Sequence, residues 1–397
     1  MELAGKRIIL GLTGGVACYK AAELARGLTK SGASVQVVMT QAAMQFITPV
    51  TMQALTGHPV YSDQWDARID NNMPHIDLTR NVDAILIAPG SADFIAKLAH
   101  GICNDLLSTL CLARPSQLPM MIAPAMNVEM WQNPATQRNV KQLKADGITV
   151  LGPEAGEQAC GETGMGRMLE SEQLLEDVVA AFQPKIMTAK RVLVTAGPTF
   201  EPIDPVRGIT NLSSGKMGYA IARAAREAGA EVTLISGPTA LPTPQGVHRI
   251  NVQTAEQMHG VVMAHIAEKD VFIAVAAVAD WRVASVSEQK WKKDEHATFP
   301  QLQFELNPDI LAEVAALPNK PYCVGFAAES EQLMRYGEEK RKKKGIPLLA
   351  GNIGHNTFGK DQNELMLFDE NGHTHLPKAD KQKIARQLIA EIARRLG

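Results

Sequence analysis

The sequence lacks the features that mark several large classes of protein. Its five cysteines are scattered and no two share a CxxC spacing, which argues against a disulfide framework and a zinc site. No apolar run approaches the about 20 residues of a membrane span. The apolar stretch 8–18 follows two basic residues, but its three glycines argue against a secretory signal. We therefore expect a cytoplasmic protein that does not enter a membrane.

An excess of charge of one sign is also missing. Lysine and arginine number 40 and the acidic residues 42, so the formal net charge is −2. No overall field therefore attracts nucleic acid or an anionic membrane, and any basic patch acts locally. Apolar residues form 45% of the chain, which is ordinary for a globular protein. At about 150 residues per domain, 397 residues predict two or three domains.

The front half opens with a pattern typical of a parallel sheet. A short apolar run, 7–11, ends at the glycine pair Gly14 and Gly15. Apolar residues then recur at helical spacing over 16–28, and a second apolar run spans 34–39. Strand, turn, helix and strand form a βαβ unit, whose strands are parallel.

The back half repeats this plan. The apolar run 191–196 precedes a long polar loop, a helical pattern at 215–227 and another apolar run at 231–236. We therefore predict an α/β protein of two doubly wound, Rossmann-like domains with mainly parallel sheets, the first of them flavodoxin-like. The predicted domains are residues 1–188 and 189–397.

Three loops in the front half follow predicted strands and are rich in small residues. They lie at 13–17, 88–93 and 123–131. Open α/β sheets bind ligands at the carboxyl ends of their strands, so these loops predict a crevice for a flat cofactor. The first loop lacks the full GxGxxG spacing, and by itself it is equally consistent with a tight turn.

Three groups in the same half are able to do chemistry. His75 lies in a polar loop, Asn127 follows a predicted strand, and Cys160 is surrounded by glycines typical of a mobile flap. Each has a structural alternative: a surface histidine, a turn asparagine and a buried cysteine. The residues alone thus suggest a flavin or nucleotide pocket with a His/Asn/Cys site.

The order of the front-half motifs is more specific than any one of them. The motifs are Thr13-Gly14-Gly15 with Tyr19-Lys20, Pro74-His75-Ile76, 88–93, 104–107, 124–127 with Met130, and Ala159-Cys160-Gly161. This set covers most of residues 1–180 and closely resembles the homo-oligomeric flavin-containing cysteine decarboxylases, above all phosphopantothenoylcysteine decarboxylase.

The resemblance implies a cofactor, a reaction and a set of site residues. FMN would oxidise the thiol of 4′-phosphopantothenoylcysteine, which lets the carboxylate leave as carbon dioxide and yields 4′-phosphopantetheine after reduction. His75 would be the acid/base, Asn127 would hold the carboxylate, and Cys160 would supply a proton in the final reduction. The FMN contacts implied are Gly14, Gly15, Val16, Ala17, Thr40, Phe46, Ala88, Ser91, Ala92, Asp93, Ala125 and Met126.

The strongest local signal in the back half is the loop 197–218. It ends in two serines, two glycines and a lysine at the start of a predicted helix, a combination that suits phosphates although the Walker spacing is absent. Ser213 as a simple N-cap is the alternative. Two basic runs follow, at 290–293 and 340–344, for which a solvated surface is the usual interpretation. A triphosphate suits them better than nucleic acid, because no nucleic-acid motif is present.

The back-half motifs also form an ordered set. They are 195–199, Glu201-Pro202, 204–207, Asn211 with 213–218, 276–280, 307–310, 325–329 and the pair Lys340 and Lys344. Residues 191–395 thereby resemble phosphopantothenate–cysteine ligase, of the bacterial type fused behind the decarboxylase.

This second resemblance implies that CTP, carried with Mg²⁺, activates 4′-phosphopantothenate as an acyl-cytidylate, and that the amine of L-cysteine displaces CMP. Lys290 would stabilise the α-phosphate, a choice over Lys292 and Lys293 that rests on the family. Asn211, with Arg207 nearby, would hold the acyl intermediate. The CTP contacts implied are Ala276, Asp280 (also the metal contact), Lys290, Pro308, Asp309, Ile310, Leu311, Phe326, Lys340 and Lys344. Those for substrate and phosphate are Arg207, Asn211, Ser213, Ser214, Gly215 and Lys216.

The resemblance also implies a homo-oligomer, with trimers of the first domain and dimers of the second, hence a dodecamer. Three other functions remain as alternatives: a peptide-cysteine decarboxylase or flavin prenyltransferase, a non-catalytic flavoprotein regulator, and an NAD-dependent dehydrogenase. The second domain counts against the first, and the absence of an acidic tail counts against the second. Neither half has GxGxxG with an acidic residue at the required distance, which counts against the third.

Overall fold

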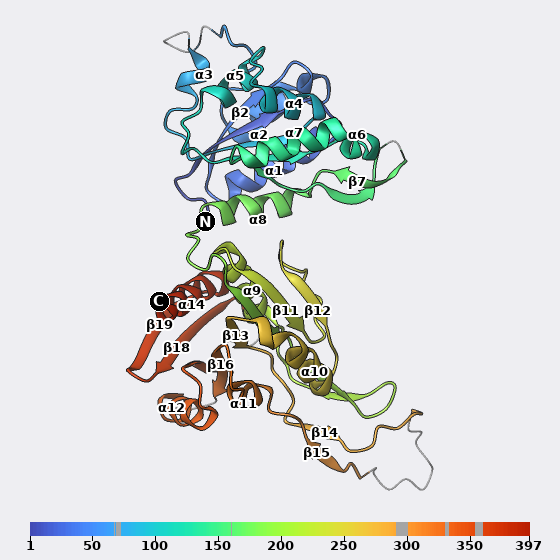
Figure 1. Ribbon diagram of the computed structural model, residues 1–397, viewed down its shortest axis with the longest axis vertical. Coiled ribbons are helices and arrows are strands. Elements are labelled where there is room, and N and C mark those ends of the chain that lie inside the picture. The colour runs from blue at the N-terminus through green and yellow to red at the C-terminus, as the bar shows by residue number, and fades with distance from the viewer. Residues whose placement is uncertain (67, 69–72, 160, 291–300, 330–332, 354–359) are drawn as a thin grey trace. The chain divides into compact units, whose positions relative to one another are not determined.

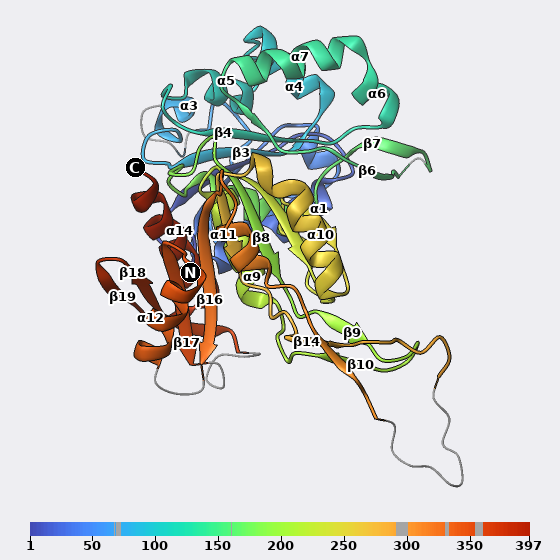
Figure 2. The same ribbon diagram turned by 60° about the horizontal axis from the view of Figure 1, so that its bottom comes forward.

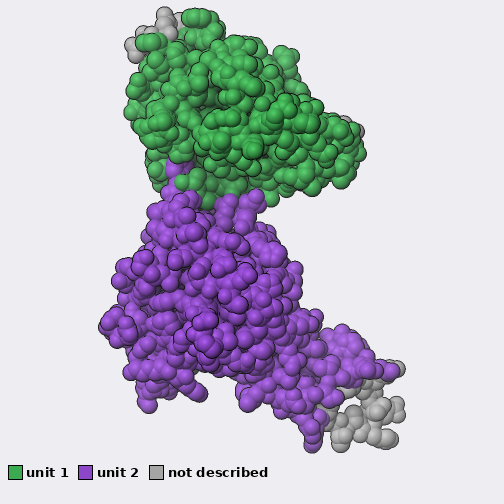
Figure 3. Space-filling view, viewed as in Figure 1, with its two compact units in different colours: residues 1–181 green, residues 182–397 purple. Residues whose placement is uncertain are grey.

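The computed structural model divides the chain into two compact units, Met1–Ala181 and Phe182–Gly397 (Figure 3). The residues that the structure describes are 1–66, 68, 73–159, 161–290, 301–329, 333–353 and 360–397. No helix within these ranges is long and apolar enough to span a bilayer.

The first unit is a five-stranded parallel sheet in the order β2-β1-β3-β4-β5, with helices on both faces (Figures 1 and 2). This is the flavodoxin-like strand order, which confirms the predicted fold class. Its elements are β1 (Arg7–Leu12), α1 (Cys18–Lys30), β2 (Ser34–Met39), η1 (Ala43–Gln45), α2 (Pro49–Thr56), α3 (Pro74–Asp77), β3 (Ala84–Gly90), α4 (Ala92–His100), α5 (Leu106–Ala113), β4 (Met120–Pro124), α6 (Val128–Gln132), α7 (Pro134–Ala145), β5 (Thr149–Val150), β6 (Glu154–Glu157), β7 (Thr163–Arg167) and α8 (Ser171–Ala181).

Continuous apolar runs form this sheet because helices bury both of its faces. All seven residues of β3 are buried. One face packs against α4, α5 and α7, where Phe94, Leu107 and Val140 join Ile85 in a single core cluster. Helices α1 and α8 pack together and form a second layer (Figure 1). After β5 the chain forms an antiparallel hairpin from β6 and β7, which returns to the edge of the sheet where β1, β3 and β4 end.

The second unit is an eight-stranded sheet in the order β12-β11-β8-β13-β16-β17-β18-β19. Its first six strands are parallel, and in chain order they run 3-2-1-4-5-6, the Rossmann order. Strands β18 and β19 extend the sheet in antiparallel fashion. The elements are β8 (Arg191–Ala196), β9 (Phe200–Pro202), β10 (Gly208–Thr210), α9 (Lys216–Glu227), β11 (Glu231–Ser236), β12 (His248–Asn251), α10 (Ala255–His265), η2 (Ile266–Glu268), β13 (Val271–Ala274), β14 (Trp281–Val283), β15 (Phe304–Leu306), α11 (Ile310–Ala315), β16 (Tyr322–Glu329), α12 (Leu333–Lys344), β17 (Leu348–Ile353), β18 (Gln362–Asp369), β19 (Gly372–Asp380) and α14 (Lys381–Leu396).

Side chains of β8 alternate between the two faces of this sheet, as the pleat requires. Val192 and Val194 join a cluster with α9 and α14, whereas Leu193 joins the cluster on the opposite face with Met258 of α10 and Phe272 of β13. The long polar loop predicted after β8 contains the two-stranded ribbon β9–β10. A second ribbon, β14–β15, runs beside it away from the sheet (Figure 2).

Candidate active sites

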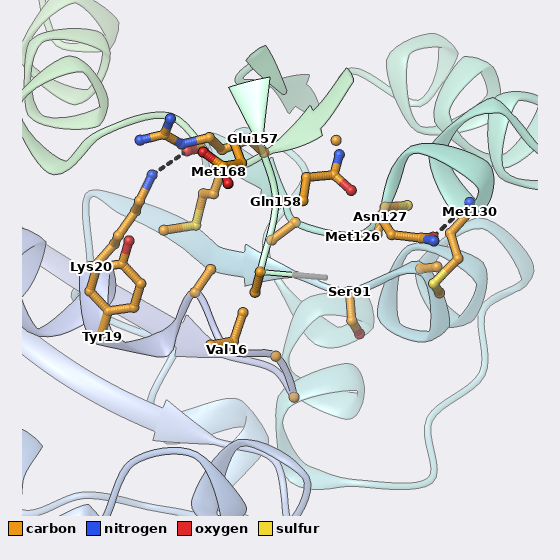
Figure 4. Close-up of a pocket in the computed structure, with 18 residues that line it drawn as sticks. Val16, Tyr19, Lys20, Ser91, Met126, Asn127, Met130, Glu157, Gln158 and Met168 are labelled. Atoms are coloured by element: carbon orange, nitrogen blue, oxygen red, sulfur yellow. Dashed lines mark hydrogen bonds between the residues drawn. The ribbon is translucent and has the colours of Figure 1, made fainter. Parts of the chain in front are cut away.

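A cavity of about 680 Å³ lies at the carboxyl edge of the first sheet, between the loops that follow β1, β3 and β4 (Figure 4). The strand order reverses between β1 and β3, which is where open α/β sheets bind ligands. Thr13 connects the loop after β1 to the loop after β3 by two hydrogen bonds. Its hydroxyl donates to the Pro89 carbonyl at 2.7 Å and accepts from the Ser91 N–H at 2.9 Å. The lining residues are Gly14, Gly15, Val16, Ala17, Tyr19, Lys20, Ser91, Ala92, Ala125, Met126, Asn127, Met130, Glu157, Gln158, Ala159, Gly166, Arg167 and Met168.

The β6–β7 hairpin forms the other wall of this cavity, with Glu157, Gln158 and Met168 opposite Val16 and Ser91 (Figure 4). Backbone and side-chain hydrogen bonds attach the hairpin to the loop after β4. The Met126 N–H donates to the Gly166 carbonyl at 3.0 Å, and the Val128 N–H donates to Gln158 Oε1 at 2.9 Å. The wall is therefore part of the folded unit.

Asn127 lies in the cavity and its amide has a fixed orientation. Its Oδ1 accepts the Met130 N–H at 3.0 Å and so caps α6, while its Nδ2 donates to Glu162 Oε2 at 3.2 Å. An amide NH₂ has two donor hydrogens, so the bond to Glu162 leaves one for a ligand. The residue thus combines the turn chemistry of an asparagine with a position suited to binding.

Most of the residues predicted to contact a flavin are brought together here. Eight of the twelve line the cavity: Gly14, Gly15, Val16, Ala17, Ser91, Ala92, Ala125 and Met126. The other four do not. Thr40 accepts the Ala43 N–H at 3.2 Å, Phe46 is exposed, Ala88 is buried within β3, and the Asp93 carboxylate pairs with Lys97 at 3.2 Å.

The other two predicted catalytic residues of this unit stand apart from Asn127. His75, on α3, lines a different cavity with Ala113 and Pro115, and α3 lies far from α6 and β7 in both ribbon views (Figures 1 and 2). The reason is topological: α3 precedes β3, whereas the Asn127 cavity lies where the strands end. Cys160 lies outside the described residues.

The chemistry of the cavity fits a flavin. Val16, Met126 and Met168 give it apolar walls, and a Cβ on Gly15 would meet no atom within 4 Å, so the backbone there is open to a close approach. Ser91 caps the nine-residue helix α4 and lines the cavity, which places a helix N-terminus beside it. Flat apolar walls suit an isoalloxazine ring, and a helix N-terminus suits a phosphate.

In the second unit, the loops after β8 and β13 meet at the point where its strand order reverses. The Thr199 N–H donates to the Ala277 carbonyl at 3.2 Å, and the Ala277 N–H donates to the Gly197 carbonyl at 2.9 Å. Asn211 joins this contact, because its Nδ2 donates to the same Ala277 carbonyl at 2.9 Å. The predicted residues Asn211 and Ala276 thus share one edge of the sheet.

The start of α9 lacks a side-chain cap. Its N-cap is Gly215, with a φ of +76°, and the hydroxyl of Ser213 accepts the Gly215 N–H at 3.3 Å instead of capping the helix. Ser213 is therefore not the simple N-cap that the sequence left open. Lys216 at this helix start pairs with Asp361 at 2.6 Å. The free N–H groups and hydroxyls at the end of this loop form a site suited to an anion.

One backbone hydrogen bond brings the residues before α11 to Asp280. The Asn307 N–H donates to the Asp280 carbonyl at 2.9 Å, which brings the start of α11 to the loop after β13. Asp309 caps α11 by accepting the Ala312 N–H at 3.1 Å, and its carboxylate also pairs with Lys344. Burial alone would raise the pKa of Asp309, but the hydrogen bonds from Lys344 and Ala312 and the charges of Lys344 and Lys340 hold it below its ordinary value.

Arg207 and Lys290 are not brought to this edge: Arg207 lies in the turn of the β9–β10 ribbon and Lys290 on the loop after β14, and both ribbons run away from the sheet (Figure 2). Arg207 pairs with the buried carboxylate of Asp204, to which its Nε donates at 2.9 Å. Lys290 is exposed, and the nearby Ser287 N–H donates to the Ile203 carbonyl at 3.0 Å. Lys292 and Lys293 lie outside the described residues. Among the residues that are described, no three His, Cys, Asp or Glu side chains cluster as metal ligands would.

Several lining residues were not singled out as site residues from the sequence, namely Lys20, Glu157, Gln158, Arg167 and Met168. All but Lys20 belong to the hairpin or directly follow it, and Lys20 lies on α1. The glycine-dense segment indicated a flap, but no pattern in it showed which side chains face inward.

Family models and full-length relatives match this chain. The flavoprotein family covers residues 1–183, and the C-terminal domain of DNA/pantothenate metabolism flavoproteins covers residues 187–396. The coenzyme A biosynthesis bifunctional protein CoaBC of Vibrio vulnificus is 48% identical over 100% of this chain and 99% of its own. Its namesake in Escherichia coli is 45% identical over 100% and 98%. A crystal structure of a CoaBC C-terminal domain is 37% identical over 53% of this chain and 98% of its own, with a TM-score of 0.47.

The fold and the sites define a class of proteins in which a flavoprotein domain is followed by a Rossmann-type domain. In each domain the candidate site lies at the sheet edge where the strand order reverses. The chain belongs to the CoaBC family, the bifunctional decarboxylases and ligases of coenzyme A biosynthesis.

Proposed function

We propose that residues 1–188 bind FMN and decarboxylate 4′-phosphopantothenoylcysteine, and that residues 189–397 make that compound from 4′-phosphopantothenate and L-cysteine with CTP and Mg²⁺. The observation that carries this proposal is that each unit has a candidate site at the sheet edge where its strand order reverses. In the first unit this site is an apolar cavity that contains Asn127. In the second unit Asn211 lies there, beside a helix start that has no side-chain cap. Family membership supports the two activities.

In the decarboxylase, Asn127 binds the carboxylate of the cysteine moiety. Its Oδ1 is held by the Met130 N–H, so its Nδ2 points in one direction and offers its second hydrogen to a carboxylate oxygen. Bound FMN supplies the reversible oxidation of the substrate thiol that allows the carboxylate to depart as carbon dioxide. The hairpin wall excludes water from this reaction, and Cys160 supplies the proton in the final reduction.

His75 acts on the substrate from a second copy of the chain. Within one chain it lines a cavity distinct from that of Asn127, so the two residues meet only across a subunit interface. We propose a trimer of the first unit that forms this interface.

In the ligase, the nucleotide converts the carboxylate of 4′-phosphopantothenate into an acyl-cytidylate, since a free carboxylate is a poor acylating agent. Asn211 and Arg207 hold the acyl group while Lys290 stabilises the charge on the α-phosphate. The loop ending in Ser213, Ser214, Gly215 and Lys216 holds the substrate phosphate. Ala276, Asp280, Pro308–Leu311, Phe326, Lys340 and Lys344 bind CTP, with Mg²⁺ on its triphosphate near Asp280.

We also propose that the second unit dimerises through its ribbons. Leu212, Trp281 and Leu306 lie on or beside them and are 90%, 57% and 74% exposed. Large apolar side chains gathered on projecting strands suit an interface between copies. Trimers of one unit and dimers of the other give a dodecamer. Light scattering of a Trp281→Ser, Leu306→Ser double variant tests this, because the assembly should fall to trimers; an unchanged mass rejects the ribbon interface.

Two isosteric substitutions test the assignment of activities. Asn127→Asp places a negative charge where the substrate carboxylate binds, so it should abolish decarboxylation and spare ligation. Asn211→Asp should do the reverse. Each variant serves as the folding control of the other, because both activities are measured on the same chain. Loss of the same activity in both variants contradicts the assignment.

Mixing subunits tests the shared decarboxylase site. Asn127→Asp and His75→Asn chains should each be inactive in decarboxylation. After joint refolding, a mixed trimer contains at least one site with both wild-type residues, so activity should return. No recovery in trimers shown to be mixed places both residues in one chain's site and rejects the proposal.

A further inference from the structure

Lys20 is a buried lysine that neither proposed mechanism uses. It lies in the first turns of α1, directly after the glycine turn that lines the cavity, and it is only 2% exposed. Removing an ammonium group from water is costly, so a lysine in this position requires compensating partners.

The partners of Lys20 come from the segment that follows the hairpin, about 150 residues later in the chain. Its Nζ donates to the Met168 carbonyl at 2.8 Å and to Glu170 Oε1 at 2.9 Å. Figure 4 shows the Lys20 ammonium directed at Met168, along the wall of the cavity. The ammonium group is therefore bound by acceptors of the same chain and does not serve as a free cation for a ligand.

Glu170 links Lys20 to a second cation. It also pairs with Arg167, the last residue of β7, which itself lies 3.6 Å from Glu154 at the start of the hairpin. Burial would raise the pKa of Glu170, yet the hydrogen bonds and charges of Lys20 and Arg167 hold it below its ordinary value. Glu170 therefore joins α1 to the end of β7, and Arg167 extends this chain of ion pairs to Glu154 at the start of β6.

Two other residues of the hairpin, Gly166 near its base and Gln158 near its tip, are held separately. The Met126 N–H binds the Gly166 carbonyl and the Val128 N–H binds Gln158, both from the loop and helix that follow β4. Without Lys20, the segment from Arg167 to Glu170 would lose its own hydrogen bonds to α1, and the nearest remaining one would be that of the Ser171 hydroxyl, which donates to Glu23 Oε2 at 3.3 Å. Arg167 and Met168 line the cavity, so their placement depends on this attachment.

We propose that Lys20 is a positioning residue of the decarboxylase site: its buried ammonium fixes the base of the β6–β7 hairpin on α1 and so sets the cavity wall formed by Arg167 and Met168. This inference rests on the proposed assignment of decarboxylation to residues 1–188. It goes beyond that assignment by giving a role to a residue that touches neither the substrate carboxylate nor Asn127.

The test uses the full-length, flavin-loaded protein. Lys20→Met keeps the length of the side chain and removes its charge and its hydrogen-bond donors, whereas Lys20→Arg keeps the charge and the donors. Lys30→Met is the matched control, because Lys30 is an exposed lysine of the same helix. Three quantities are measured: amide hydrogen exchange at 154–159 and 161–168, retention of flavin on gel filtration, and kcat/KM for decarboxylation. Ligation by the same chains shows that the second unit is intact, and decarboxylation by wild-type protein shows separately that the proposed function holds.

In Lys20→Met we expect faster exchange in the hairpin with unchanged protection of β1 and β3, weaker flavin retention, and a fall in kcat/KM of about 10- to 100-fold. Lys20→Arg should restore most of all three, and Lys30→Met should resemble wild type. Two results overturn the proposal. One is wild-type exchange and kcat/KM in Lys20→Met. The other is loss of protection throughout the first unit with no rescue by Lys20→Arg, which assigns Lys20 to the core alone.

Discussion

Gly166 gives the sharpest prediction about the hairpin wall. Its φ of +138° is one that other residues rarely adopt, and a Cβ there would lie 2.4 Å from the Met126 carbonyl oxygen and 3.2 Å from that of Asn127. These two obstacles are backbone atoms, which cannot rotate away, and the side-chain Nε2 of Gln158 lies at 3.0 Å as well. Gly166→Ala must therefore push the hairpin off the loop that carries Asn127.

The cost follows from two contributions. A residue held in such a conformation is strained by about 1–3 kcal/mol, and the hydrogen bond from the Met126 N–H is worth about 0.5–1.5 kcal/mol. Together they weaken the attachment of the hairpin by about 1.5–4.5 kcal/mol, or about 10- to 2,000-fold in its equilibrium. The second unit does not contain these contacts, so ligation should not change.

The assay compares flavin absorbance after gel filtration, the decarboxylation rate and the ligation rate. Gly166→Ala should lose flavin and decarboxylation and keep ligation. Gly147→Ala is the control: its φ of +78° is also positive, but a Cβ there meets nothing within 4 Å. Gly166→Ala with wild-type flavin content and decarboxylation would refute the argument, and an equal loss in Gly147→Ala would trace the effect to strain alone.

Three further predictions concern a lysine and several cysteines. Lys290→Gln should abolish ligation and spare decarboxylation in separate product assays; loss of both points to misfolding. In Cys160→Ser, decarboxylation should proceed and an oxidised aminoenethiol-type product should accumulate by mass spectrometry, whereas full turnover removes this thiol from the mechanism. Burial raises the pKa of Cys18 to about 11 and that of Cys111 to about 12, so both stay protonated at pH 8. Because alkylation requires a thiolate, the exposed Cys103 should react with iodoacetamide in the folded protein while these two stay intact, and their early alkylation contradicts their burial.

The sheets were the most predictable part of the molecule. Strands buried on both faces are short apolar runs, and the predicted runs 34–39, 191–196 and 231–236 coincide with β2, β8 and β11. The βαβ rule predicted parallel strands but not their order, because the order depends on the edge of the sheet at which each crossover adds its strand.

The walls of the sites were less predictable because they depend on contacts between distant segments. Lys20 looks like an ordinary helical lysine until Met168 and Glu170 are folded against it. The polar loop after β8 showed no alternation long enough to reveal β9 and β10, each of three residues. His75 carried no sign that its own chain places it away from Asn127.

Capping also changed the roles available to predicted residues. Asp309 was predicted as a nucleotide contact, and the structure uses its carboxylate to cap α11 and pair with Lys344. The sequence indicates that the Asp309 carboxylate lies near a helix start. Which groups it pairs with depends on the tertiary fold, which brings Lys344 beside it.

Product analysis tests the central claim most directly. Purified protein is incubated with 4′-phosphopantothenate, L-cysteine, Mg²⁺ and either CTP or ATP, and the products are identified by mass spectrometry. We predict 4′-phosphopantetheine with CTP, together with CMP, pyrophosphate and carbon dioxide. Phosphopantothenoylcysteine alone would contradict the flavin half of the account, and the absence of both products from folded, yellow protein would contradict the assignment of the ligase.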